Sequence, residues 1–273
     1  MDNRTILVLQ GPKGTPQELS PLANAVAAVG GRLHVLQVDE MPAIPTYAIE
    51  GYPVPAGWDQ TRRELADNLK TRGAETATYL ANLGVATETD IIYETAVEMA
   101  HQIVPHALRA DVAVITNDLR ENKDVFQSLS HGILFESPIP LILNPTENAI
   151  TPKRVTVAWS ESLPTARAVH AALPILKAAQ DVTLCVIDPK EGRADNSQAI
   201  AAWLSHHGCK VTVVQTPSKG QPIAEVLLRC ALEDGADLLV IGAFGHSRMR
   251  QRLFGGTTRS IIEQTKQAVF LAH

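Results

Sequence analysis

The sequence predicts an α/β protein built from two tandem copies of one five-stranded unit with a parallel sheet. Short apolar runs of strand length alternate with helical stretches, and the same order occurs twice within 273 residues. The closest match lies between Ala110–Thr116 and Ala236–Gly242, which read ADVAVIT and ADLLVIG. Continuous apolar strands linked through helices are typical of a parallel sheet covered on both faces. We therefore assign residues 1-149 and 150-273 to two domains, joined by the polar linker Pro145–Pro152.

The predicted strands can be paired between the two halves in order. In the first half they are Thr5–Leu9, Leu33–Asp39, Asp90–Tyr93, Ala110–Thr116 and Pro140–Leu143. Their counterparts are Val155–Trp159, Val182–Asp188, Val211–Val214, Ala236–Gly242 and Ala268–Leu271. Helices are predicted at Leu22–Val29, Ala96–Leu108, Ala166–Ala179 and Pro222–Glu233. The first half is the longer one between its second and fourth strands, which indicates an insertion around Met41–Arg62. This insertion is either a surface loop packed by its own aromatic residues or a lid or partner contact.

The composition is that of a globular protein and excludes several classes of function. Hydrophobic residues make up 45% of the chain, charged residues make up 19%, and the formal net charge of -5 gives no support for nucleic-acid binding. No apolar run approaches the ~20 residues of a membrane-spanning helix, and no signal peptide is evident. We therefore expect a cytoplasmic protein without membrane insertion. The three cysteines show no CxxC spacing, so no metal site is expected.

The loop after the fourth strand of the second half has the residue types that an anion site needs. A helix is predicted to begin near Gly256, with threonines able to cap it. Glycines allow close approach of a ligand to the backbone, and the N–H groups and dipole of a helix start favour phosphate. The residues concerned are Gly242, Gly245, Arg248, Arg250, Arg252, Gly255, Gly256, Thr257 and Thr258. As a pattern alone, this spacing fits turn formation as well as phosphate binding.

Gly242, Gly245 and Gly255 match the spacing Gly-x2-Gly-x9-Gly at the end of a fourth strand, and here the sequence resembles the universal stress protein family. The resemblance covers the whole chain, twice. It implies two tandem α/β sandwiches of the universal stress protein (adenine nucleotide alpha hydrolase-like) type. Many members of that family bind ATP, with adenosine against the ends of the first and second strands and phosphates on the glycine loop.

Carried over residue by residue, the resemblance implies a nucleotide site in the second domain only. Its adenosine end is formed by Ala158, Trp159, Ser160 and Val186, and its phosphate end by Gly242, Gly245, Gly255, Gly256, Thr257 and Thr258. Two positions depart from the family pattern. Ser160 stands where ATP binders usually have an acidic residue, and Gly256 stands where Ser or Thr is usual.

The first half departs further from the pattern. Its corresponding loop, Thr116–Ser130, contains no glycine, and Asp118, Glu121 and Asp124 would repel a phosphate. Gln10 stands at the position of the acidic residue. We expect this domain to be structural. It would form an intramolecular pseudo-dimer with the second domain, supplying the face that a single-domain relative finds in another subunit. Whether the chain also forms a homodimer stays open.

The leading functional hypothesis is a stress-response or regulatory protein that binds ATP or a similar adenine nucleotide, with or without magnesium, and reports it to an unidentified protein partner. No catalytic residue is assigned. A slow ATPase is one alternative, although no carboxylate lies between Gly242 and Ser260 and nothing orients His246 as a base. A nucleotide-free interaction scaffold is the other.

Overall fold

The computed structural model describes residues 4–42, 57–189, 196–244, 256–264 and 266–273. The contacts within the chain divide it into two compact units, Asn3–Pro138 and Ile139–His273. Among the helices of the described ranges, none combines the length and apolar character needed to cross a membrane.

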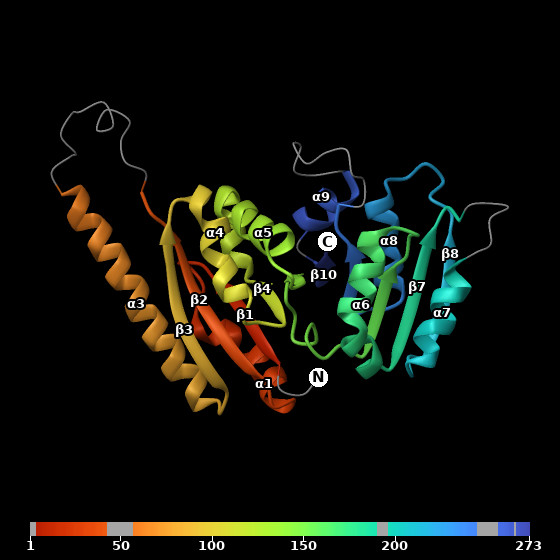
Figure 1. Ribbon diagram of the computed structural model, residues 1–273, viewed down its shortest axis with the longest axis horizontal. Coiled ribbons are helices and arrows are strands. Elements are labelled where there is room, and N and C mark those ends of the chain that lie inside the picture. The colour runs from red at the N-terminus through yellow and green to blue at the C-terminus, as the bar shows by residue number, and fades with distance from the viewer. Residues whose placement is uncertain (1–3, 43–56, 190–195, 245–255, 265) are drawn as a thin grey trace. The chain divides into compact units, whose positions relative to one another are not determined.

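In its described residues, the N-terminal unit contains four parallel strands in the order β3-β2-β1-β4. The strands are β1 (Thr5–Gln10), β2 (Arg32–Glu40), β3 (Ala86–Glu94) and β4 (Val112–Ile115). The helices are η1 (Pro16–Leu19), α1 (Ser20–Ala28), α3 (Trp58–Asn82), α4 (Ala96–Ala107), η2 (Asn117–Glu121) and α5 (Lys123–Glu136). Alternate residues of a strand point to opposite faces. Gln37 of β2 therefore bonds to Thr76 of α3, whereas His34 lies against His106 of α4. Figure 1 shows α3 and α4 on opposite sides of β2 and β3.

The C-terminal unit contains six strands in the order β5-β10-β9-β6-β7-β8. The strands are β5 (Leu141–Leu143), β6 (Arg154–Ala158), β7 (Asp181–Ile187), β8 (Val211–Thr216), β9 (Leu238–Gly242) and β10 (Val269–Ala272). The helices are α6 (Leu163–Ala178), α7 (Asn196–His206), α8 (Ile223–Glu233) and α9 (Gly256–Glu263). Both units place their third, second, first and fourth strands in that order, as expected for two copies of one fold.

The strands predicted from apolar runs are confirmed, and their central residues form the core. Leu7, Val35, Val157 and Val240 are fully buried, and burial of each such side chain contributes roughly 1.5–3 kcal/mol. β3 is longer than the predicted Asp90–Tyr93. Its first residues, Ala86–Thr89, are largely polar, so a prediction from apolar runs did not include them. A strand at the edge of the order tolerates such residues, since only one of its sides pairs with a neighbour.

Two features differ from the sequence-based expectation. The fifth strand of the first repeat, β5, belongs to the C-terminal unit and pairs antiparallel with β10, with Ile142 opposite Phe270. Within the proposed insertion Met41–Arg62, residues 43–56 lie outside the described part of the chain. Its end is helical rather than a loop, because α3 begins at Trp58, and the guanidinium of Arg62 lies over the Trp58 ring at 5.0 Å.

Candidate functional site

A cavity of about 510 Å³ lies at the carboxyl ends of β6, β7 and β9 in the C-terminal unit. Ligands of open α/β sheets bind beyond these strand ends. Most of the predicted nucleotide-site residues line this cavity, namely Ala158, Trp159, Ser160, Val186, Gly242, Thr257 and Thr258. Gly256 is the first residue of α9, which confirms the predicted helix start. Gly245 and Gly255 lie outside the described residues. Residues from separate strand ends and from a helix start therefore meet around one space.

Gly242 lies where the end of β9 packs closely against the first turn of α6. A Cβ atom at this position would lie 2.4 Å from the backbone nitrogen of Thr165 and 2.5 Å from the carbonyl carbon of Pro164. Both atoms belong to the backbone of the first turn of α6, which cannot easily move away. The absence of a side chain at Gly242 is thus required by helix packing, apart from any ligand.

Three hydroxyl groups form a cluster where α6 begins. Ser160 Oγ lies 2.9 Å from Thr165 Oγ1 and 3.1 Å from Ser162 Oγ. Ser162 is the N-cap of α6 and accepts a hydrogen bond from the backbone N–H of Thr165. All three residues line the cavity. Ser160, which stands where an acidic residue is usual in the family's ATP binders, is therefore part of a polar wall at a helix start. Only Ser160 was predicted from the sequence, although Ser162 followed by Leu163 and Pro164 is a recognisable helix-start signal.

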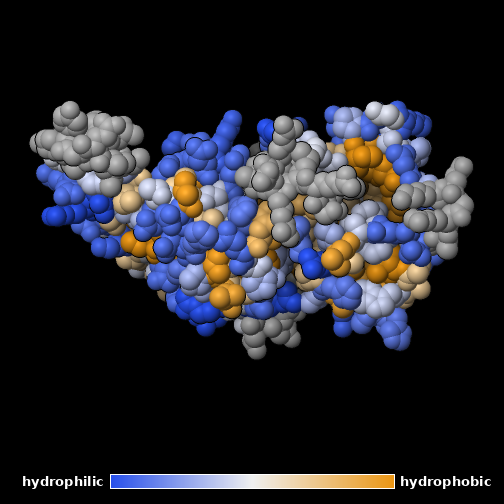
Figure 2. Space-filling view, turned by 45° about the horizontal axis from the view of Figure 1, so that its top comes forward, coloured by the Kyte–Doolittle hydropathy of each residue, from blue (hydrophilic) through white to orange (hydrophobic). Residues whose placement is uncertain are grey.

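An apolar wall also lines the cavity. Side chains from β7, α8, β9 and α9 contribute to it, namely Ile187, Ile223, Leu227, Ile241 and Ile261. Figure 2 shows a patch of hydrophobic surface at the upper right of the molecule, over the C-terminal unit. Trp159 adds an aromatic ring whose Nε1 donor is buried without a hydrogen-bond partner in the described part of the chain. A flat heteroaromatic ligand would find apolar and aromatic contacts here.

Two carboxylates lie at the cavity, both missed as site residues by the sequence analysis. Glu161 follows Ser160 directly and is exposed. Asp188 follows β7 with a positive φ of 48°, and its Oδ1 accepts a hydrogen bond from the backbone N–H of Ser218 at 2.7 Å. Hydrogen bonds from the hydroxyl and backbone of Ser218 lower the pKa of Asp188, so its carboxylate is charged at neutral pH. These groups suit hydroxyl or amine donors and disfavour nearby phosphate.

The start of α9 also lines the cavity. Thr257 is exposed at the first turn, and Thr258 Oγ1 accepts a hydrogen bond from the backbone N–H of Phe244 at 3.4 Å. Phe244 has a positive φ of 59°, a conformation that turns the chain directly after β9. The first N–H groups of a helix lack partners within that helix, which makes this end attractive to anions.

The corresponding strand ends of the N-terminal unit are arranged differently. Asp118 accepts hydrogen bonds from the backbone N–H of Gly14 at 2.8 Å and from Thr116 Oγ1 at 2.5 Å. Its Oδ2 would lie 2.6 Å from a Cβ atom at Gly11, so the carboxylate lies directly against the loop after β1. Arg72 of α3 donates to the carbonyl groups of Gly11 and Gly14. Side chains of the protein itself therefore form hydrogen bonds with the backbone of the loop after β1.

Comparisons with known proteins agree with the fold. Residues 151–273 match the model of the universal stress protein family. Among solved structures, a universal stress protein from Archaeoglobus fulgidus DSM 4304 is similar with a TM-score of 0.69 and 15% identity, covering 97% of this chain and 95% of that one. The protein PA1789 from Pseudomonas aeruginosa PAO1, of unknown function, is similar with a TM-score of 0.58 and 15% identity, covering 99% and 92%.

No curated protein matches the chain. At 15% identity the solved structures establish a shared fold and nothing more. The family assignment rests on the C-terminal half, where the sequence match and the fold coincide. Residues 151–273 form a domain of the universal stress protein family.

Proposed function

We propose that the C-terminal domain binds an adenine nucleotide in the cavity at the ends of β6, β7 and β9, and that the protein acts in the stress response as a nucleotide-dependent regulator. Family membership supports the stress-response role. The observation that carries the nucleotide proposal is the convergence of Trp159, Val186, Gly242 and Thr257 on one cavity of about 510 Å³. This volume suits a small organic ligand.

The chemistry of the walls suggests how the nucleotide lies. The adenine ring packs against Val186 and the apolar wall, beside Trp159. The ribose hydroxyls donate to Asp188, whose remaining lone pairs can accept them. The phosphates extend away from this carboxylate toward the start of α9 at Thr257. This orientation keeps the negative phosphates apart from the negative carboxylate of Asp188.

Nucleotide binding is proposed for this domain alone. In the N-terminal unit, Asp118 occupies the space beside Gly11, and its negative charge disfavours a phosphate there. We propose that this unit serves a structural role, including the pseudo-dimer arrangement expected from the repeat. A protein partner that reads the nucleotide state belongs to the same proposal.

Strong catalysis is not part of the proposal. Hydrolysis of ATP needs an oriented water and, in most enzymes, a metal held by carboxylates. The carboxylates at the cavity, Glu161 and Asp188, follow β6 and β7, and neither follows β9, the strand before the glycine loop. Slow hydrolysis with magnesium is the second candidate function, and phosphate release above background would favour it.

The proposal is tested by titration calorimetry of the full chain with ATP, ADP, AMP and adenosine. We expect one nucleotide per chain, because Asp118 lies against the loop after β1 at the strand ends of the N-terminal unit. Binding of two equivalents would contradict the restriction to the C-terminal domain. No detectable binding at ligand concentrations on the order of 1 mM, where even weak complexes form, would reject nucleotide binding and favour the interaction scaffold.

A further inference from the structure

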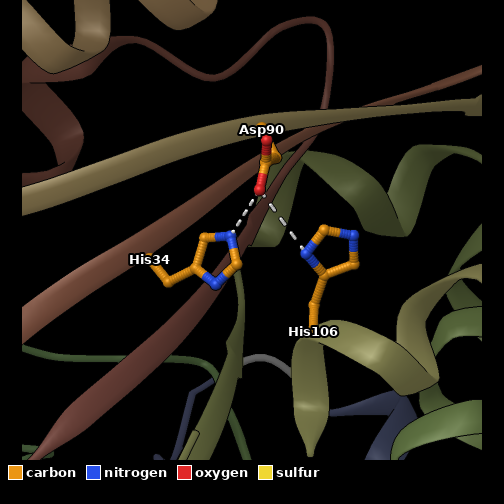
Figure 3. Close-up of side chains that lie close together, drawn as sticks. All are labelled: His34, Asp90 and His106. Atoms are coloured by element: carbon orange, nitrogen blue, oxygen red, sulfur yellow. Dashed lines mark hydrogen bonds and ion pairs between the residues drawn. The ribbon is translucent and has the colours of Figure 1, made fainter. Parts of the chain in front are cut away.

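His34, Asp90 and His106 of the N-terminal unit form a cluster that the nucleotide proposal does not use. His34 Nε2 lies 3.0 Å from Asp90 Oδ2, and His106 Nδ1 lies 3.7 Å from the same oxygen. The three ligand atoms all lie within 4.8 Å of one another. Figure 3 shows the two imidazole rings approaching one carboxylate oxygen from different sides.

Three separate elements bring these residues together. His34 lies near the beginning of β2, Asp90 in the middle of β3, and His106 in the last turn of α4. Asp90 pairs with Leu36, two residues after His34, so both side chains point to the face that α4 covers. The spacing of residues in the sequence could not predict this arrangement, because the three residues are far apart along the chain. The strand at Asp90–Tyr93 was predicted, but no ligand was assigned within it.

We propose that His34, Asp90 and His106 bind a late first-row divalent metal ion of the Zn²⁺ class. Two imidazole nitrogens and one carboxylate oxygen are ligands that Zn²⁺ favours, at distances of about 2.0–2.2 Å. Tetrahedral ligands at those distances lie about 3.4 Å apart, close to the observed 3.0 and 3.7 Å.

The state of the histidines supports this assignment. His106 Nδ1 is buried and has no hydrogen-bond partner in the described part of the chain, so the protein leaves a nitrogen lone pair or proton unsatisfied. The carboxyl end of α4, where His106 lies, also favours a cation through the helix dipole.

The charged groups around the cluster leave Asp90 free to act as a ligand. Glu88 precedes it on the same face of β3 and contacts Arg32 at 3.0 Å and Arg109 at 3.8 Å. These arginines are therefore engaged with Glu88. The Asp90 side chain is 44% exposed, so solvent can reach the ion and supply a fourth ligand. The ion would join β2, β3 and α4, which suits a stabilising role.

A second histidine of α4, His101, provides a matched comparison. Glu136 is flanked by His101 at 2.9 Å and His131 at 3.3 Å, but the two contacts use different carboxylate oxygens. His101 is also 71% exposed. Replacing it removes one histidine from α4 without touching the proposed site.

The test is titration of metal-free full-length protein with Zn²⁺ by calorimetry, and with Co²⁺ by its visible ligand-field absorption. We expect one strong site in the wild type and in H101Q. Affinity should fall about 100-fold or more in H106Q and D90N, because loss of a direct ligand costs at least as much as loss of an outer-shell partner. D90N keeps a hydrogen-bond acceptor for His34, so we expect it to stay folded. It therefore tests the site even if H106Q is unstable. Far-UV circular dichroism checks the fold of each variant.

Three outcomes overturn the proposal. One is the absence of Zn²⁺ binding at free concentrations on the order of 0.1 mM. Another is equal affinity in wild type and a folded D90N or H106Q. The last is loss of binding in H101Q with retention in H106Q, which would place the ion at Glu136. None of these outcomes bears on nucleotide binding, so the two proposals stand or fall separately.

Discussion

Gly242 and Thr165 lie so close together that a Cβ atom on the glycine would be 2.4 Å from the backbone nitrogen of the threonine. This contact joins the end of β9 to the first turn of α6. A glycine of the family motif is therefore explained by packing within the protein. Substitutions at Gly242 therefore disturb the packing of α6 directly, so a loss of ligand binding in such variants would not show that Gly242 contacts the ligand.

Gly242→Ala is expected to lower the free energy of unfolding by about 1–3 kcal/mol, the usual cost of overpacking against a rigid neighbour. Urea unfolding measures the change. Gly256→Ala is the matched control, because no atom lies within 4 Å of a Cβ there and Ala is favoured over Gly in a helix by roughly 0.5–1 kcal/mol. Equal effects of the two substitutions would contradict the packing explanation.

Thr257→Glu is expected to weaken ATP binding while preserving the fold. A carboxylate in the first turn of α9 is favoured by the helix dipole, typically by 0.3–1 kcal/mol. The same charge repels phosphates, so we expect at least about a tenfold loss of ATP affinity, or ~1.4 kcal/mol, with little change for adenosine. Thr257→Gln has a similar size without the charge and should bind ATP nearly as well as the wild type. Calorimetry showing unchanged ATP affinity in the Glu variant would place the phosphates elsewhere.

Asp188→Asn tests the ribose contact. A hydrogen bond to a charged group contributes about 1.5–3 kcal/mol, so loss of the charge should weaken ATP binding by roughly tenfold or more. Binding of 2′,3′-dideoxy-ATP should not change, because that ligand lacks the hydroxyls. Asp181→Asn, at the other end of β7, is the control and should leave both affinities unaltered. An equal loss for both ligands in Asp188→Asn would rule out a ribose contact.

Asp39 should destabilise the protein increasingly as pH rises. Burial at the end of β2 is the largest cause of its raised pKa, only partly offset by the Glu40 backbone and Arg72. A carboxyl group with a raised folded-state pKa holds its proton more tightly when folded, so stability falls as pH rises from the unfolded value through the folded one. Asp39→Asn should therefore stabilise the protein at pH 7 and make little difference below about pH 3.8, the unfolded value.

Urea unfolding across that pH range provides the measurement. Asp181→Asn should act in the opposite direction, because the hydrogen bond from Lys210 lowers the pKa of Asp181. Its stabilising contribution is present above the unfolded pKa and is lost as pH falls through the folded one. A stabilising effect of Asp39→Asn that persists unchanged at low pH would contradict the burial explanation.

The repeat and the position of the cavity could be predicted from the sequence, because apolar runs specify strands and a parallel sheet places their carboxyl ends together. Ala236–Gly242 ends at the cavity as expected. Contacts between distant residues could not be predicted in this way. The hydroxyl contact of Ser160 with Thr165 and the approach of His34 to Asp90 depend on side-chain geometry that a one-dimensional pattern does not contain.

Strand direction was also beyond the sequence pattern. The run Leu141–Leu143 is as apolar as a parallel strand, and nothing within it indicates an antiparallel partner. Its direction follows from the chain that surrounds it. The phosphate loop remains a prediction at Gly245 and Gly255, which lie outside the described residues.

The pairing of β5 with β10 has a practical consequence for anyone who divides this chain. A fragment beginning at residue 150 would contain the whole family match but would lack Leu141–Leu143. The backbone groups of Val269–Leu271 that face β5 would then have no neighbour, and such bare strands recruit other chains. Fragments of the second repeat are best begun at Ile139, so that its self-association in solution is not mistaken for a property of the whole protein.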